Sequence, residues 1–189
     1  MDATTEYALA YALTTTAGIR AFLALLAAAI AAHVGWIHLT NSFAWLGSTS
    51  SIVVLAIFAL LEILGDKIPV VDHVLHLIYF VLRPAAAAIL VAGTVHTPSY
   101  AELVTLMVVG ALNAFVVHGS IATVRAASTA TTLGVVNPGL SAVEDVVAVG
   151  GGAAAIAFPI AAAVIALIFV IALVLVVRRV TTVGRPSYR

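Results

Sequence analysis

Apolar segments of about bilayer length follow one another through almost the whole chain. The longest, from Val146 to Val177, contains no charged residue and no polar side chain. A helix needs about 20 mostly apolar residues to cross roughly 30 Å of hydrocarbon. Because 63% of the 189 residues are hydrophobic and only 8% are charged, the sequence predicts an all-α, polytopic integral membrane protein with five or six transmembrane helices.

Four further apolar segments complete the expected set, at roughly 7–34, 50–65, 71–94 and 101–125. The run 146–177 would be about 48 Å long as one helix, too long for one upright span and too short for two full ones. A hairpin there, bent at Gly150–Gly152 or Pro159, gives six crossings, whereas one kinked helix gives five. A turn without polar side chains would leave backbone groups unpaired in lipid, which is an argument against the hairpin. We nevertheless favour six crossings.

Interruptions within these segments predict Pro-kinked or broken helices. Arg20 interrupts the first segment, and the candidate hinges are Pro69, Pro84, Pro138 and Pro159. We expect one transmembrane domain over 1–189 with a short basic tail at 180–189. Two halves, about 7–94 and 101–178, are possible, because 51–69 aligns with 120–138, or alternatively the surroundings of Arg20 with those of Arg125. Such repeats underlie many transporters.

Charge and cysteine content exclude several classes of function. Eight basic and eight acidic residues cancel, so nucleic acid is not an expected partner, and the absence of cysteine excludes thiolate sites. His73 and His76, with Asp72, are a weak metal pattern, and six histidines permit a bis-histidine haem. No hydrolase or nucleotide-binding motif is present. We expect no metal and no cofactor, and an enzyme is the less favoured interpretation.

The basic residues also predict an orientation. In the six-span arrangement Lys67, Arg125 and the four C-terminal arginines share one face, which the positive-inside rule makes cytoplasmic. The acidic N-terminus lacks the basic region of a secretory signal, so we expect no cleavage. The prediction is a multi-pass protein of the bacterial inner (plasma) membrane with a cytoplasmic C-terminus.

Polar residues recur at helical spacing inside the third and fourth segments. Asp72, His76, Tyr79 and Arg83 lie at offsets of 0, 4, 7 and 11, on one stripe, and His118 and Arg125 are seven apart. A charge near the bilayer centre costs at least about 2.5–3.5 kcal/mol, so such residues tend to be paired and functional. The alternative is an ion-pair network that only fixes packing, or arginines that snorkel to the interface.

Two acidic turns carry the remaining candidates. In EILGDKIPVVD, Glu62 and Asp66 are one helical turn apart and repel unless a cation lies between, which the adjacent Lys67 could supply. In NPGLSAVED, Ser141 with Glu144 has the spacing of a capping box. The interpretations are simple capping in water, or one polar site shared by both turns.

The chain resembles a bacterial and plant membrane family known as domain of unknown function 4126. The resemblance rests on Gly18-Ile19-Arg20, LEILGDKIPVVD, Arg83-Pro84, His118-Gly119 with Arg125, and NPGLSAVED. It implies a small multi-spanning membrane protein without an assigned reaction. The family pattern commonly has a lysine shortly after His-Gly, where this chain has Ile121 and its neighbours.

A transporter or channel for a small solute or ion is the favoured function, with a charge-paired site between helices. A non-catalytic scaffold or assembly subunit is the alternative, since small residues favour close helix contacts, and a lipid-acting intramembrane enzyme is less favoured. Expected partners are the bilayer, a small solute or ion, and further copies of the chain. The candidate pathway residues are Arg20, Glu62, Asp66, Lys67, Asp72, His76, Arg83, His118, Arg125, Asn137, Ser141, Glu144 and Asp145.

Overall fold

The described part of the chain folds into helices and loops, without a strand. The computed structural model describes residues 1–67 and 69–183, except for the side chains at 69–74, 76 and 183. The elements are α1 (Ala3–Ile19), α2 (Ala21–His33), the 3-10 helix η1 (Asn41–Gly47), α3 (Thr49–Gly65), α4 (Pro69–Thr94), α5 (Tyr100–Thr132), α6 (Asn137–Ala157) and α7 (Pro159–Val183). The predicted all-α membrane fold is confirmed.

Helices α4 to α7 are each long and apolar enough to cross a membrane. Helix α3 joins them as a fifth span if it is counted together with η1, from which it is bent by 65°. Five is the lower of the two expected numbers, but it is reached in a different way. Both expected counts included 7–34 as one crossing, and this segment is folded as two short helices, of 17 and 13 residues. The run 146–177, one kinked helix in the expected count of five, is divided between α6 and α7.

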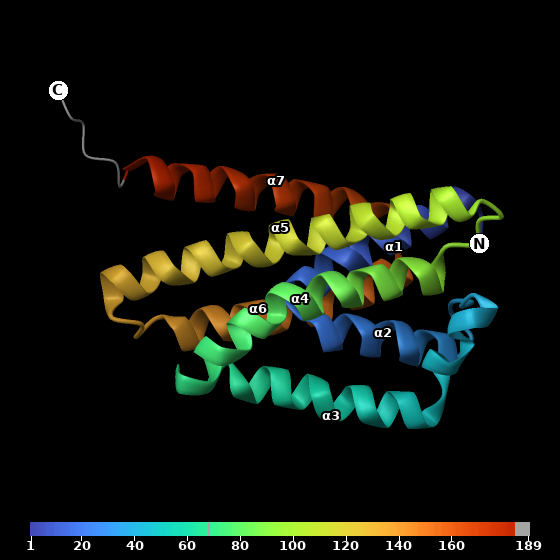
Figure 1. The fold of residues 1–189 in the computed structure, drawn as a ribbon, viewed down its shortest axis with the longest axis horizontal. Helices are drawn as coiled ribbons and strands as arrows, with labels where there is room; N and C mark the ends of the chain where they lie inside the picture. Colours follow the sequence, from blue (N-terminus) through green and yellow to red (C-terminus); the bar gives the residue numbers. More distant parts are fainter. Residues whose placement is uncertain (68, 184–189) are drawn as a thin grey trace.

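Helices α1 and α2 form a hairpin whose tip is Arg20. The backbone of Arg20 is extended (φ −144°, ψ 105°), so the helix stops and restarts there. Near the start of α1, Glu6 accepts a hydrogen bond from the backbone N–H of His96. Beyond α2, Thr40 donates its N–H to the carbonyl of Gly93 at 2.8 Å. Both open ends of the hairpin therefore lie beside the same end of α4, and the chain enters the bundle and returns (Figure 1).

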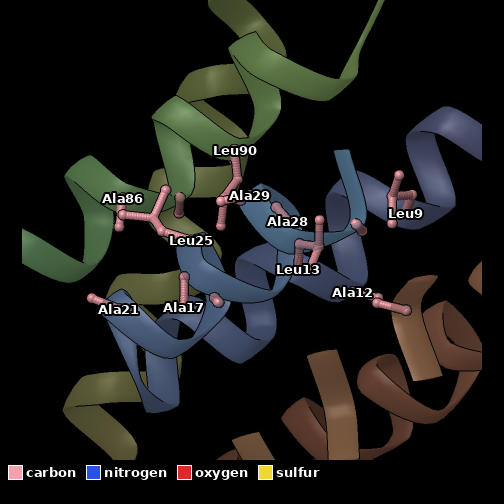
Figure 2. Packing of buried hydrophobic residues seen from close by; sticks show 14 of the residues in the cluster. Leu9, Ala12, Leu13, Ala17, Ala21, Leu25, Ala28, Ala29, Ala86 and Leu90 are labelled. Atoms are coloured by element: carbon pink, nitrogen blue, oxygen red, sulfur yellow. The ribbon is translucent and has the colours of Figure 1, made fainter. Parts of the chain in front are cut away.

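Small residues let this hairpin lie close against its neighbours. Figure 2 shows alanines and leucines of α1, α2 and α4 meeting in the main core. A Cβ on Gly18 would lie 2.7 Å from Val117 Cβ and 2.9 Å from a backbone oxygen of α5, so α1 and α5 are in near-backbone contact. In lipid such close packing replaces the hydrophobic effect as the force that holds helices together.

Helices α6 and α7 form a second hairpin, which turns at Phe158 and Pro159. Helix α6 begins at Asn137, nine residues before the apolar run, so the segment NPGLSAVED supplies its first turns and lengthens it to 21 residues. The glycines at 150–152 stay helical. Phe158 donates its N–H to Ala154 and its carbonyl accepts from Ala162. Phe158 thus continues the hydrogen bonding of both helices through the turn, which weakens the objection to a hairpin in lipid.

Three of the four candidate hinge prolines lie at helix starts. Pro69 and Pro159 are the first residues of α4 and α7, and Pro138 lies in the first turn of α6, where a missing N–H costs nothing. Pro84 lies inside α4, which continues through it. Whether any of the four acts as a hinge stays a prediction.

The hairpin can be tested by single-cysteine labelling, because the native chain has no cysteine. We expect Thr4→Cys and Ser42→Cys, both at exposed positions, to react with a membrane-impermeant maleimide from the same side of the membrane. Val135→Cys, in the exposed connection between α5 and α6, should react from the other side. If α1 and α2 crossed the membrane together, Thr4→Cys and Ser42→Cys would instead react from opposite sides.

Candidate functional site

The break between α1 and α2 is closed by two side chains from other helices. Glu62 of α3 accepts hydrogen bonds from the N–H groups of Ala21 and Phe22, each at 3.0 Å, at the start of α2. Arg83 of α4 donates Nη1–H to the carbonyl of Gly18, near the end of α1, at 3.2 Å. An anion favours a helix start and a cation a helix end. The two charges, with Oε1 and Nη2 3.7 Å apart, thus each bind one of the broken ends and pair with each other.

Arg83 is buried in the centre of the bundle. Its Nη1 lies 2.6 Å from Nδ1 of His118. Because a guanidinium only donates, this nitrogen of His118 accepts and carries no proton. The guanidinium also lies over the ring of Tyr79, 4.7 Å from its centre. These contacts join α4 to α5 at the level of the break.

Arg20, at the tip of the hairpin, joins the two acidic turns. Its Nη1 is paired with the carboxylate of Asp66, at the end of α3. Its Nη2 donates to Oγ of Ser141 at 2.9 Å and lies 2.8 Å from Oδ1 of Asp145, an ion pair without hydrogen-bond alignment. The side chain is fully buried. EILGDKIPVVD and NPGLSAVED therefore meet around one arginine.

Arg125 of α5 forms the outer part of the same network. It holds Glu144 with two hydrogen bonds, Nε to Oε1 at 2.9 Å and Nη2 to Oε2 at 2.7 Å. Its Nη2 also lies 3.4 Å from Oδ2 of Asp66. Lys67, with a side chain 41% exposed, pairs with Asp145 at 3.1 Å. The network thus runs from the bundle interior to its surface.

Among the described side chains this network contains four cations and four anions. Its members are Arg20, Lys67, Arg83 and Arg125 with Glu62, Asp66, Glu144 and Asp145. Burial is complete at Arg20 and Glu62 and falls towards Lys67. Two carboxylate oxygens, Oδ1 of Asp66 and Oδ1 of Asp145, are buried and accept no hydrogen bond from the described residues.

Two local predictions about these residues are wrong. Ser141 does not cap a helix: α6 begins at Asn137, and Ser141 lies a turn inside it with its hydroxyl on Arg20. Lys67 does not separate Glu62 from Asp66, because each carboxylate has an arginine of its own. Both predictions considered only neighbours in sequence, whereas the partners are 21 to 121 residues away.

The remaining candidates lie apart from the network or outside the description. Asn137 donates to Thr129 at 2.8 Å and fixes the turn between α5 and α6. The side chains of Pro69, Asp72 and His76 are outside the described residues, as is that of His73. Within the described part of the chain, no three histidine or acidic side chains gather in a group that could hold a metal.

A second polar cluster, at the opposite end of the bundle, has no counterpart in the sequence analysis. Glu6 binds His96, and Glu102 accepts from the hydroxyls of Tyr7 and Thr97. Between the two clusters, Asn113 of α5 donates to Thr14 and Thr15 of α1. The run of three threonines at 14–16 was the available signal that α1 faces a polar partner.

Removal of Glu62 tests how much the break depends on it. We expect Glu62→Ala to lower the free energy of unfolding by about 3–5 kcal/mol, because Arg83 and two backbone N–H groups lose a buried partner. Lys67→Ala, which removes an exposed partner of an acid, should cost no more than about 1 kcal/mol. Reversible unfolding in mixed detergent micelles measures both. Equal, small losses in the two variants would show that the break does not need Glu62.

Comparison with known proteins agrees with the resemblance seen in the sequence. The family model described as domain of unknown function (DUF4126) matches residues 7–179, which include every described member of the ion-pair network. No curated protein and no solved structure matches the chain. Because the match covers nearly the whole chain, this protein belongs to the family of domain of unknown function 4126.

Proposed function

We propose that this membrane protein is a transporter or channel for a small solute or ion, with its site in the ion-pair network. The observation that carries the proposal is the helix break at Arg20, closed by Glu62 and Arg83. Broken helices with charged groups at their ends form substrate sites in many secondary transporters. Buried charges inside a membrane bundle are costly to keep and mark pathways more often than packing.

The distribution of polar groups supports a pathway with one closed end. The network comes to the surface at Lys67 and reaches inward to His118. Beyond it, towards the end that carries Glu6, the hairpin is held by alanine and leucine packing against α4 (Figure 2). A solute would therefore enter from the Lys67 end and be stopped by the apolar core until the hairpin moves.

The same asymmetry supports an orientation. The connection between α3 and α4, the last turns of α5 and the end of α7 lie towards one end of the bundle (Figure 1). These segments carry Lys67, Arg125, and Arg178 with Arg179. The connections at the other end, 34–48 and 95–99, contain no lysine or arginine. By the positive-inside rule the basic end is cytoplasmic. We therefore assign the protein to the bacterial inner membrane with a cytoplasmic C-terminus and a hairpin that enters from the outside.

Labelling of whole cells tests this orientation. Tyr100→Cys lies at the start of α5, and Val135→Cys follows the end of the same helix; both positions are about 81% exposed. We expect an impermeant maleimide to label Tyr100→Cys in intact cells and Val135→Cys only in everted vesicles. The opposite pattern would place the network at the outer surface.

Flux through purified protein in liposomes tests the function itself. With imposed proton or sodium gradients and a panel of small solutes, we expect uptake by the native protein and a loss of at least about tenfold in Arg125→Gln, because Glu144 then loses its bidentate partner. Arg178→Gln, on the last turns of α7, is the matched control and should retain uptake.

Two outcomes would count against a transporter. Absence of flux across the panel in correctly folded native protein would reject it and favour the scaffold interpretation. Uptake unchanged in Arg125→Gln would show that the network is not on the pathway and serves helix packing instead.

A further inference from the structure

A small cavity adjoins the network on the side of the second hairpin. It measures about 150 Å³ and lies between α5, α6 and α7, against the end of α1. Its walls are mostly apolar, with Ile19, Ile121, Val124, Val143, Phe169 and Leu173 among them. An apolar protein cavity of about this volume accepts a benzene-sized molecule. The space therefore suits one branched aliphatic group or one aromatic ring.

One positively charged and one negatively charged side chain line this cavity, and they lie next to each other. Arg125 and Glu144 are the two charged residues among its described lining, and they are bound to each other through both guanidinium and carboxylate atoms. Their side chains are 6% and 12% exposed. A molecule in the cavity thus has an apolar surround for one part and a guanidinium with a carboxylate for another.

A zwitterion matches this lining better than a simple ion does. Its carboxylate can take the place of Glu144 on the planar fork of Arg125, and its ammonium group can pair with the released Glu144. A simple anion would leave Glu144 with only the more distant guanidinium of Arg20, 3.8 Å away, and a simple amine would leave Arg125 with only Asp66, 3.4 Å away. A buried charge that loses its closest, hydrogen-bonded partner is strongly unfavourable.

The other place where a carboxylate could bind is already filled. The N–H groups at the start of α2 hold the carboxylate of Glu62, at 3.0 Å from each nitrogen. A substrate carboxylate would have to displace a fully buried ion pair there. Arg125, nearer the surface and beside open volume, is the accessible partner.

We infer that this cavity binds a small zwitterion with an apolar side chain, of the class of neutral α-amino acids, between Arg125 and Glu144. The inference rests on the proposed function, since it names the substrate class of the same site. The ammonium and carboxylate groups of such a solute share one carbon, which places its side chain directly in the apolar part of the cavity.

Binding to protein in phosphatidylglycerol nanodiscs, measured by calorimetry, tests the class of ligand. The probes are L-leucine, 4-methylpentanoate, which lacks the ammonium group, and 3-methylbutylamine, which lacks the carboxylate. We expect leucine to bind at least about tenfold more tightly than either analogue, because a site built for both groups discriminates against molecules that lack one. Equal affinity for leucine and 4-methylpentanoate, or binding of none of the three, would overturn the inference.

Variants locate the site. We expect Glu144→Gln to lose the preference for leucine over 4-methylpentanoate, since the amide no longer pairs with an ammonium group. Val124→Phe, which fills the cavity from α5, should weaken leucine binding at least about tenfold. Val116→Phe is its control: it lies on α5, is 41% exposed and does not line the cavity. Leucine binding unchanged in Val124→Phe would place the ligand elsewhere and overturn the assignment.

Further measurements separate this inference from the proposed function. Flux of a different solute that depends on Arg125, without leucine binding, would reject the zwitterion site and leave the transporter intact. Leucine binding without flux of any solute in the panel would leave the site intact and reject transport. The headgroup of phosphatidylethanolamine is also a zwitterion, so the leucine titration is repeated in nanodiscs of that lipid. If leucine binds more weakly there, the lipid competes for the cavity. The site would then bind the headgroup, and the inference of a free solute would be overturned.

Discussion

The ion pair between Glu62 and Arg83 is the interaction on which the bundle depends. A helix that stops inside a membrane leaves N–H and C=O groups where no water can satisfy them. Here one carboxylate takes two N–H groups of α2, and one guanidinium takes a carbonyl of α1. The pair thereby makes an interrupted helix tolerable in the bundle core. It also fixes α3 and α4 against the hairpin, so the break organises the packing of four helices.

From the capped break, the network extends outward by sharing partners. Asp66 contacts both Arg20 and Arg125, and Asp145 contacts both Arg20 and Lys67. In this outer part, Arg20, Arg125 and the carboxylates around them therefore have more than one counter-charge within reach, and a ligand that takes one partner need not leave the other alone. This redundancy is a property that a purely structural pair would not need. It gives the proposed site a physical way to exchange partners during a transport cycle.

Hydropathy and residue spacing predicted much of this architecture, for reasons that are local. Long apolar runs identify spans, and Arg20, Glu62, Arg83 and Arg125 stand out because charge is rare there. The direction of the chain after Arg20 was not predictable, because an apolar segment has the same hydropathy whether it continues across the membrane or turns back. Ser141 was assigned to a cap for a similar reason: its true partner, Arg20, is 121 residues away. The cavity depends on side chains from four helices, which no local pattern contains.

The hairpin of α1 and α2 also constrains the order of biogenesis. Helices α1 and α2 are made first, but the groups that complete their interrupted backbone, Glu62 and Arg83, are made 42 and 63 residues after Arg20. Until α3 and α4 are in place, the tip of the hairpin has no partner in lipid and is better kept near water. We therefore expect the segment that is synthesised first to be among the last to reach its place in the bundle.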